Sequence, residues 1–335
     1  MNILISCPGR MVETVSVLKK EFAEAGFGVI ATGNSMKIPA LHAADKAYVV
    51  PSVDDVDYIP SLLEICRYND VVAILSLLDK DVINISKAIS EFRNLGTMPI
   101  MVDHLVANIC CNKLNFYEFL VDHGFKCAKT FNSFENFVAA HNCGEIDFPV
   151  FVKPVDGEGS RRVAKCHTMN ELSRFMLQND DLIVQEFLDG PQYDIDVYID
   201  LISRKMISIF AKENLSMLNG ISNKVVPKND PSIFSLSEQL LEQLGAVGPM
   251  NIEMFKVNGD YYINEINPRL EASYPVAYAC GVDFGQLMVN NLKGIENKAN
   301  IGDYGSDVLF LKYDRVIIKP PEQMNAIMVH NQGDV

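Results

Sequence analysis

Apolar and polar residues alternate along this chain with the period of strands in some segments and with the period of helices in others. These periods predict where strands and helices lie. Short apolar runs at Asn2–Ser6, Val29–Ala31 and Val71–Leu75 have the length and composition of buried strands. The segment Met11–Ala25 has helical periodicity and is followed by Gly26, a typical helix terminator. This alternation of strands with helices favours a parallel, doubly wound α/β sheet for the first part of the chain.

The middle of the chain is predicted to carry a second group of strands. They are Val150–Lys153, Val163–Cys166, Asp181–Leu188, Tyr193–Asp200, which alternates and should be half-buried, and Lys205–Ala211. Thr168 and Glu171 form a capping box for one helix, and Ile233–Leu244 has the period of another. Residues 213–230, rich in Asn, Ser, Gly and Lys, predict a mobile loop with Lys224 as a candidate phosphate contact.

The segment Met250–Pro275 predicts two strands joined by a tight turn. Its first strand alternates apolar with polar residues, and Asn258-Gly259 supplies residues that adopt positive φ in turns. A two-residue turn would place Glu253 and Glu265 on opposite faces of the hairpin, so we predict a three-residue loop over 258–260. The second strand then places four residues on one side, Tyr261, Ile263, Glu265 and Asn267.

This predicted hairpin offers oxygen ligands to a hard cation. Glu265 and Asn267 are two residues apart and point the same way, and Glu253 would lie opposite Glu265. Mg²⁺ takes a few such oxygens and completes its octahedron with phosphate and water. Arg269 follows with a planar fork suited to phosphate or carboxylate. Paired glutamates alone also fit an ordinary hairpin with exposed acids.

A second candidate site for phosphate precedes the hairpin. The strand Val150–Lys153 presents Lys153, and the loop 156–162 that follows contains Gly157, Gly159 and Ser160. Glycines let backbone amides approach a polyphosphate closely. Lys113 lies forty residues earlier, at the start of a predicted helix. Arg161 and Arg162 fit either an additional positive charge or a solvated loop.

The first turn of the chain, Cys-Pro-Gly-Arg, lacks the spacing of a dinucleotide-binding loop. Ligands of open α/β sheets bind beyond the carboxyl ends of the strands, which makes Gly9, Arg10 and Asp79 candidate positions. Ordinary turn and surface roles are equally open for all three.

Length and composition indicate a globular protein of two or three domains. The chain has 335 residues, of which 48% are hydrophobic and 21% charged. No apolar run approaches the ~20 residues needed to cross a bilayer, and the start resembles a first strand more than a signal peptide. We therefore expect no membrane partner.

Charge and cysteine usage narrow the functional classes. A net charge of −14 argues against a nucleic-acid surface, which would need clustered Lys and Arg. The eight cysteines contain no C-x-x-C pair, and no H-E-x-x-H is present. This pattern favours free thiols in a reducing cytoplasm over a disulfide framework or a zinc site.

The run Asn-Glu-Ile-Asn-Pro-Arg, residues 264–269, resembles the metal-binding strand of the ATP-grasp superfamily, particularly its branch similar to the large subunit of carbamoyl phosphate synthase. With the two lysines and the glycine loop, the resemblance covers the whole chain in order. It implies a doubly wound pre-ATP-grasp domain over residues 1–107 and a two-subdomain ATP-grasp fold, α+β, over 108–315. The lid would span about 126–187, and 316–335 would form a tail.

The resemblance also implies roles for individual residues. Lys113 and Lys153 would reach the phosphates of ATP under the loop of Gly157, Gly159 and Ser160, and the hinge would bind adenine. The hinge residues are Gln185, Glu186, Phe187 and Leu188. Gln192 stands where the family usually has a ribose-binding Glu, which puts that contact in doubt. The metal ligands would be Glu253, Glu265 and Asn267, and Arg269 would act on the transferring phosphoryl group.

The implied activity is that of a ligase in which a small-molecule carboxylate attacks ATP, with Mg²⁺ or Mn²⁺, to give an acyl phosphate that an amine then displaces. Two alternatives stay open: a carbamoyl-phosphate-type or other phosphotransferase, and a non-catalytic ATP sensor. A homodimer is common in the family. Neither carboxylate nor amine can be named from the sequence.

Overall fold

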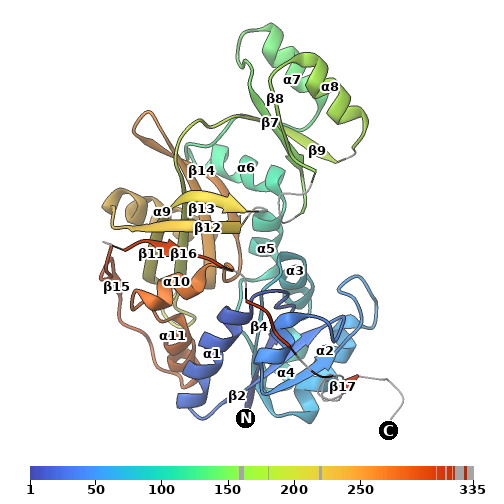
Figure 1. Cartoon of the computed structure of the whole chain (residues 1–335), viewed down its shortest axis with the longest axis vertical. Helices are drawn as coiled ribbons and strands as arrows, with labels where there is room; N and C mark the ends of the chain where they lie inside the picture. The colour runs from blue at the N-terminus through green and yellow to red at the C-terminus, as the bar shows by residue number, and fades with distance from the viewer. Residues whose placement is uncertain are drawn as a thin grey trace.

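Three β-sheets organise the part of the chain that the structure describes. The computed structural model describes residues 1–157, 162–179, 181–218, 221–306, 308–313, 315–318, 320 and 328–329. Figure 1 places the N-terminal unit, in blue, at one end, a small four-stranded unit at the other, and a seven-stranded sheet between them. Among the described residues, no helix combines the length and apolarity needed to cross a membrane.

The N-terminal unit is a parallel sheet with the order β17-β3-β2-β1-β4-β5. Its strands are β1 (Asn2–Ser6), β2 (Gly28–Gly33), β3 (Lys46–Val49), β4 (Val71–Ser76), β5 (Met98–Pro99) and β17 (Met328–Val329). Its helices are α1 (Val12–Glu24), α2 (Tyr58–Tyr68), α3 (Asp79–Lys87) and α4 (Ile89–Asn94), with the 3₁₀ turn η1 (Pro39–Ala43). Leu4 packs with α2, whereas Ile3 and Ile5 pack with α1 on the other face. The predicted doubly wound sheet is confirmed.

The four-stranded sheet, β6-β9-β7-β8, carries two helices on one side (Figure 1). Its elements are β6 (Thr130–Phe131), α7 (Phe134–Asn142), β7 (Val150–Pro154), β8 (Ala164–Cys166), α8 (Met169–Leu177) and β9 (Leu182–Glu186). Thr168 accepts a hydrogen bond from the backbone N–H of Glu171, as the predicted cap requires. Phe137 and Leu172 pack on Val150 and Val184, so this unit has a small core of its own.

The helices α5 (His104–Cys111) and α6 (Lys113–Asp122) connect the N-terminal unit to the other two sheets (Figure 1). The expected boundary between residues 107 and 108 falls inside α5, and the division into domains stays a prediction. β17 adds its two residues to the edge of the N-terminal sheet beside β3.

The central sheet is the scaffold of the candidate site. Its strands are β10 (Gln192–Ile199), β11 (Met206–Leu218), β12 (Ile221–Lys228), β13 (Gly248–Val257), β14 (Asp260–Asn267), β15 (Asn300–Ile301) and β16 (Phe310–Leu311). Ile195, Ile252 and Met254 on one face pack on α9 (Pro231–Leu244). Two further helices, α10 (Tyr274–Ala279) and α11 (Phe284–Leu292), pack with α1.

Polar side chains occupy the opposite face of the central sheet. Asp194 pairs with both Glu253 and Lys212 across the ladder, and Asp196 pairs with Asn251. Directly paired residues share a face. The expectation of a half-buried β10 is wrong: both of its faces are covered from Tyr193 to Ile199, since it lies between β11 and β13.

The mobile loop expected at residues 213–230 is also wrong. β11 continues to Leu218 and β12 returns from Ile221, and Lys224 pairs with Ser216 and Leu311. Two register shifts in this hairpin disturb the alternation of apolar and polar residues, which explains why the sequence pattern suggested a loop.

The three-residue loop expected between β13 and β14 is wrong as well. Val257 pairs with Asp260, so the turn holds only Asn258 and Gly259, with φ of +53° and +92°. Both residues at positive φ are typical of the two-residue hairpin turn that Asn-Gly favours.

A register shift in β14 nevertheless brings the two glutamates together. Met254 pairs with Ile263 and Glu253 pairs with Glu265, so Asn264 is an extra residue in the ladder. The shift reverses the alternation beyond it. Tyr261 and Ile263 therefore lie on the face opposite to Glu265 and Asn267, contrary to the sequence prediction.

Gly190, just before β10, packs closely against the backbone of this hairpin. A Cβ atom there would lie 2.1 Å from the backbone oxygen of Lys256. We predict that Gly190→Ala lowers the free energy of unfolding by about 2 kcal/mol or more, because two backbone segments must separate. Urea denaturation measures the change. Gly305→Ala is the matched control, since a Cβ at Gly305 meets nothing within 4 Å. Equal stability of both variants would contradict this packing.

Candidate active site

Two lysines from different elements converge on Glu265. Asn112 caps α6 and thereby fixes the first helical residue, Lys113, whose Nζ lies 3.6 Å from Glu265 Oε1. Lys153 comes from β7 and its Nζ lies 3.9 Å from Glu265 Oε2. Both side chains are largely buried, at 11% and 7% exposure. Two positive charges thus face one carboxylate of the hairpin.

Glu253 is the less compensated carboxylate of the pair. Burial, together with the negative charge of Glu265, raises its pKa to about 8. Gln192 donates a hydrogen bond of 3.1 Å to it, and Gln192 is the residue expected to contact ribose. Burial also lowers the pKa of Lys153, against the opposing effect of Glu265. Burial therefore disfavours the ionised form of Glu253, which a nearby cation would favour.

Asn264, the extra residue of β14, belongs to the same cluster. Lys153 Nζ donates to its Oδ1 at 3.4 Å, and its Nδ2 donates to Glu253 at 3.4 Å. Strict alternation had placed this residue on the other face of the strand. Only the register shift, which no residue pattern signalled, reveals its contribution.

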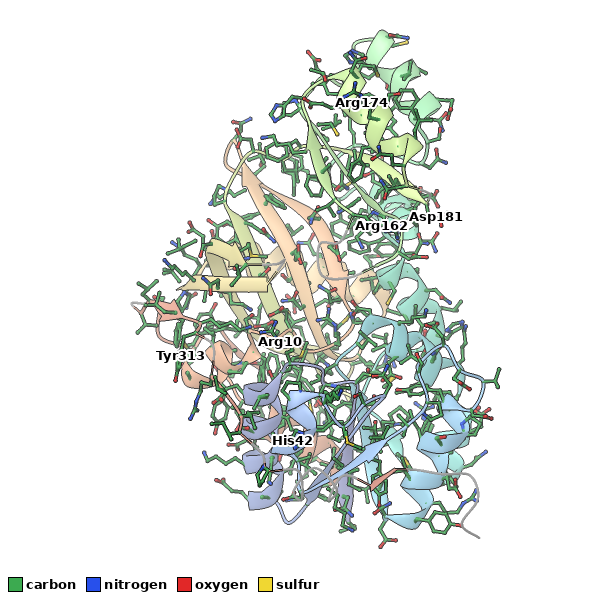
Figure 2. All side chains as sticks on the ribbon, turned by 45° about the vertical axis from the view of Figure 1, so that its right-hand side comes forward. Arg10, His42, Arg162, Arg174, Asp181 and Tyr313 are labelled. Atoms are coloured by element: carbon green, nitrogen blue, oxygen red, sulfur yellow. The ribbon has the colours of Figure 1, made fainter. Side chains whose placement is uncertain are left out.

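Arg269 is held by the N-terminal unit. Its Nε lies 2.9 Å from Asp79 Oδ1, and its Nη2 donates to Asp79 Oδ2 at 3.1 Å. Asp79 begins α3, just beyond β4, which is one of the positions that the sequence singled out. Arg10, another such position, is exposed where the N-terminal unit meets the central sheet (Figure 2).

The glycine loop is described only in part. Gly157 has φ of +133°, and its backbone oxygen accepts a hydrogen bond of 3.1 Å from Lys113. Gly159, Ser160 and Arg161 lie outside the described residues. Arg162 is exposed at the end of the small sheet nearest the centre of the molecule (Figure 2).

The residues expected to bind adenine lie at the end of β9. Gln185 is buried and donates to Thr130 Oγ1 at 2.9 Å, while Glu186 accepts from the backbone N–H of Lys129 at 3.1 Å. Lys165 Nζ lies 3.5 Å from the centre of the Phe187 ring, and Leu188 is buried. β9 runs beside β7, so this segment and Lys153 belong to one sheet. Its binding of adenine stays a prediction.

Four further polar residues, which the sequence did not single out, lie on the same face as Asn267. They are Asn251, Asp194, Asp196 and Lys212, all of them buried, and Lys212 Nζ lies 2.5 Å from Asp196 Oδ2. Burial disfavours the charge of Lys212, but Asp196, Asp194 and Glu271 outweigh it and raise its pKa. Alternation of Asp194 and Asp196 with apolar residues in β10 was the available signal.

The oxygen donors fit Mg²⁺ better than a softer metal. In the described part of the chain, no three His, Cys, Asp or Glu side chains are grouped as a metal site would require. Glu253 and Glu265 supply carboxylates on one face, and Asn267, paired with Asn251 in the ladder, faces the same side. Two carboxylates and an amide leave several positions for phosphate and water, as Mg²⁺ sites usually do.

Fold and site together define an α/β protein in which a lysine of the four-stranded sheet contacts the charged face of the central sheet. The chain belongs to the ATP-grasp superfamily: residues 110–273 match the ATP-grasp domain. Residues 3–100 match the PylC-like N-terminal domain.

Curated relatives are distant and differ in length. The arginine-specific large chain of carbamoyl phosphate synthase from Bacillus subtilis is 23% identical over 292 residues, 82% of this chain and 27% of that protein. The alpha-aminoadipate–LysW ligase LysX from Saccharolobus solfataricus is 30% identical over 109 residues, 30% of this chain and 40% of that protein. This chain thus matches less than half the length of either relative.

Solved structures share the fold. The biotin carboxylase domain of Hydrogenobacter thermophilus 2-oxoglutarate carboxylase, determined with MgADP and bicarbonate, has a TM-score of 0.73 and 16% identity. The match covers 92% of this chain and 73% of that one. At this identity the likeness shows the fold alone.

The raised pKa of Glu253 predicts how metal-free stability depends on pH. Its folded pKa of about 8 lies above the ordinary value of 4.5, so the folded state holds an extra proton between these values. Stability then falls as pH rises through that window. Glu253→Gln stays neutral, and we expect its melting temperature in EDTA to exceed that of the unmodified protein at about pH 9, with little difference at about pH 4.

Glu265→Gln is the control for this prediction. It removes the carboxylate that faces Lys113 and Lys153, and should bring no such gain at high pH. A Glu253→Gln variant that melts no higher than the unmodified protein at about pH 9 would show that Glu253 ionises without penalty in the fold.

Proposed function

We propose that this protein is an ATP- and Mg²⁺-dependent ligase that activates a small-molecule carboxylate as an acyl phosphate and joins it to an amine, releasing ADP and phosphate. The observation that carries the proposal is the convergence of Lys113 and Lys153 on Glu265, directly across the ladder from Glu253. Phosphoryl transfer needs positioning and charge neutralisation more than covalent help from the protein.

The side chains of this chain would divide the work by position. Lys113 and Lys153 neutralise the phosphates of ATP, and the hinge Gln185–Leu188 holds the base. Glu253, Glu265 and Asn267 hold Mg²⁺, which neutralises charge on the terminal phosphates when it is bound. The loop at Gly157 would cover the phosphates and exclude water from the acyl phosphate.

Arg269 is the residue proposed to stabilise the transferring phosphoryl group or to anchor the substrate carboxylate. Its present partner, Asp79, holds it by two contacts of 2.9 and 3.1 Å. The guanidinium group could exchange the carboxylate of Asp79 for a phosphate or a substrate carboxylate, since both kinds of anion accept two parallel N–H donors. The N-terminal unit would thus help to hold the substrate.

The relatives favour C–N bond formation but do not identify the substrates of this chain. One is named a ligase of alpha-aminoadipate and LysW, and another a carbamoyl phosphate synthase chain. The second name supports the second candidate function, in which the final product is a phosphorylated compound. A homodimer remains a prediction from the resemblance, and a cytoplasmic location remains a prediction from the cysteine pattern.

The nucleotide product tests the proposed chemistry. With a panel of small carboxylates and hydroxylamine in place of the amine, a hydroxamate should form in step with ADP and inorganic phosphate. The reason is that both lysines, together with Mg²⁺ held by the acidic pair, would stabilise charge on the terminal phosphates. Chromatography of the nucleotides measures the outcome. AMP and pyrophosphate as stoichiometric products would overturn the mechanism, and a stable phosphorylated product without hydroxamate would favour the phosphotransferase.

A further inference from the structure

A row of buried polar groups leads away from Asn267. Asn267 Nδ2 donates to Asn251 Oδ1 at 3.3 Å, and Asn251 Nδ2 donates to Asp196 Oδ1 at 3.0 Å. The other oxygen of Asp196 lies 2.5 Å from Lys212 Nζ. Exposure is at most 6% for each of these four residues, so water does not compete for these bonds.

The register of the sheet builds this row. Asn251 of β13 pairs with Asp196 of β10 on one side and with Asn267 of β14 on the other. The three side chains therefore lie in line across neighbouring strands and on one face. Lys212, on β11, closes the row at its far end.

The direction of the hydrogen bonds follows from the carboxylate. A side-chain amide can turn over, because its oxygen and nitrogen have nearly the same shape. Asp196, ionised against Lys212, only accepts, so Asn251 must present its N–H group to it. The oxygen of Asn251 then faces Asn267, and Asn267 must present its own N–H group in turn.

With the amides in this order, the side-chain oxygen of Asn267 is the one that can face the proposed metal site. Asn267 Oδ1 is directed away from Asn251 and accepts a hydrogen bond of 3.4 Å from Arg269 Nη2. If Asn267 were turned over, it would present N–H groups to the cation and its oxygen to the oxygen of Asn251. Both contacts would be repulsive.

We propose that Asp196 and Asn251, backed by Lys212, are positioning residues that hold the carbonyl oxygen of Asn267 toward the Mg²⁺ site. The inference rests on the proposed function, in which Asn267 binds the metal. It adds that the affinity for the metal is set partly by a carboxylate two strands away from the ligand. Groups that orient metal ligands typically change metal affinity by about 10- to 100-fold when they are removed.

Asp196→Asn tests the proposal, because the new amide can either donate or accept and no longer dictates the direction of the row. The probe is Mn²⁺, titrated into protein saturated with a non-hydrolysable ATP analogue, with free Mn²⁺ followed by electron paramagnetic resonance. We expect Mn²⁺ to bind about tenfold more weakly or worse. Binding of the analogue in EDTA should change less than about twofold, a split that general damage to the fold would not produce.

Asp200→Asn is the matched control. Asp200 lies four residues further along the chain, is also buried, and accepts hydrogen bonds from Asn291 and Asn297 instead of Asn251. Its variant should bind Mn²⁺ within about twofold of the unmodified protein. Asn251→Ala gives a second test if Asp196→Asn does not fold, since it removes the acceptor of Asn267 and leaves the Asp196–Lys212 pair. It should weaken Mn²⁺ as Asp196→Asn does.

Glu265→Gln tests the proposed metal site separately from the positioning role of Asp196 and Asn251. If this variant binds Mn²⁺ normally, the metal site of the proposed function is wrong. If it loses Mn²⁺ while Asp196→Asn and Asn251→Ala bind Mn²⁺ as well as Asp200→Asn does, the metal site is supported and the positioning role is wrong. Equal loss of Mn²⁺ and of metal-free analogue binding in Asp196→Asn and Asn251→Ala would also overturn the positioning role.

Discussion

The pairing of Glu253 with Glu265 across one face of the β13–β14 hairpin is the constraint on which the site depends. Two carboxylates so close repel each other, and burial adds to the penalty, as the raised pKa of Glu253 indicates. Lys113 and Lys153 form their ion pairs with Glu265, and the effect of Lys153 on Glu253 does not offset the burial of that carboxyl group. A cation beside the two carboxylates, together with phosphates bound to the two lysines, would therefore stabilise this arrangement of charges.

The three sheets each contribute to this one place. The four-stranded sheet supplies Lys153, the connecting helix α6 supplies Lys113, and the N-terminal unit supplies the carboxylate that holds Arg269. These charged side chains are largely buried, and electrostatic interactions are stronger there than in solution. Under the proposed function, the three parts of the fold would together supply the charge neutralisation that phosphoryl transfer needs.

Much of the fold could be predicted from the sequence because strand and helix periods are local. The doubly wound N-terminal sheet, the cap at Thr168 and the helix α9 follow from residues close together in the chain. The register of the hairpin could not be predicted, since the shift at Asn264 depends on how two strands pair. Asn-Gly correctly signals a two-residue turn, and the shift, not a longer loop, unites the glutamates. The row of hydrogen bonds from Asp196 through Asn251 to Asn267 could likewise not be predicted, because it depends on which strands lie side by side.

Anomalous scattering from Mn²⁺ in crystals grown with a non-hydrolysable ATP analogue tests the central claim most directly. The account predicts a manganese peak on the polar face of the hairpin, within about 2.1–2.3 Å of oxygens from Glu265, Asn267 and the terminal phosphates, with Glu253 on the same or a second ion. A peak bound only by phosphate, with the hairpin carboxylates turned away from it, would contradict the account.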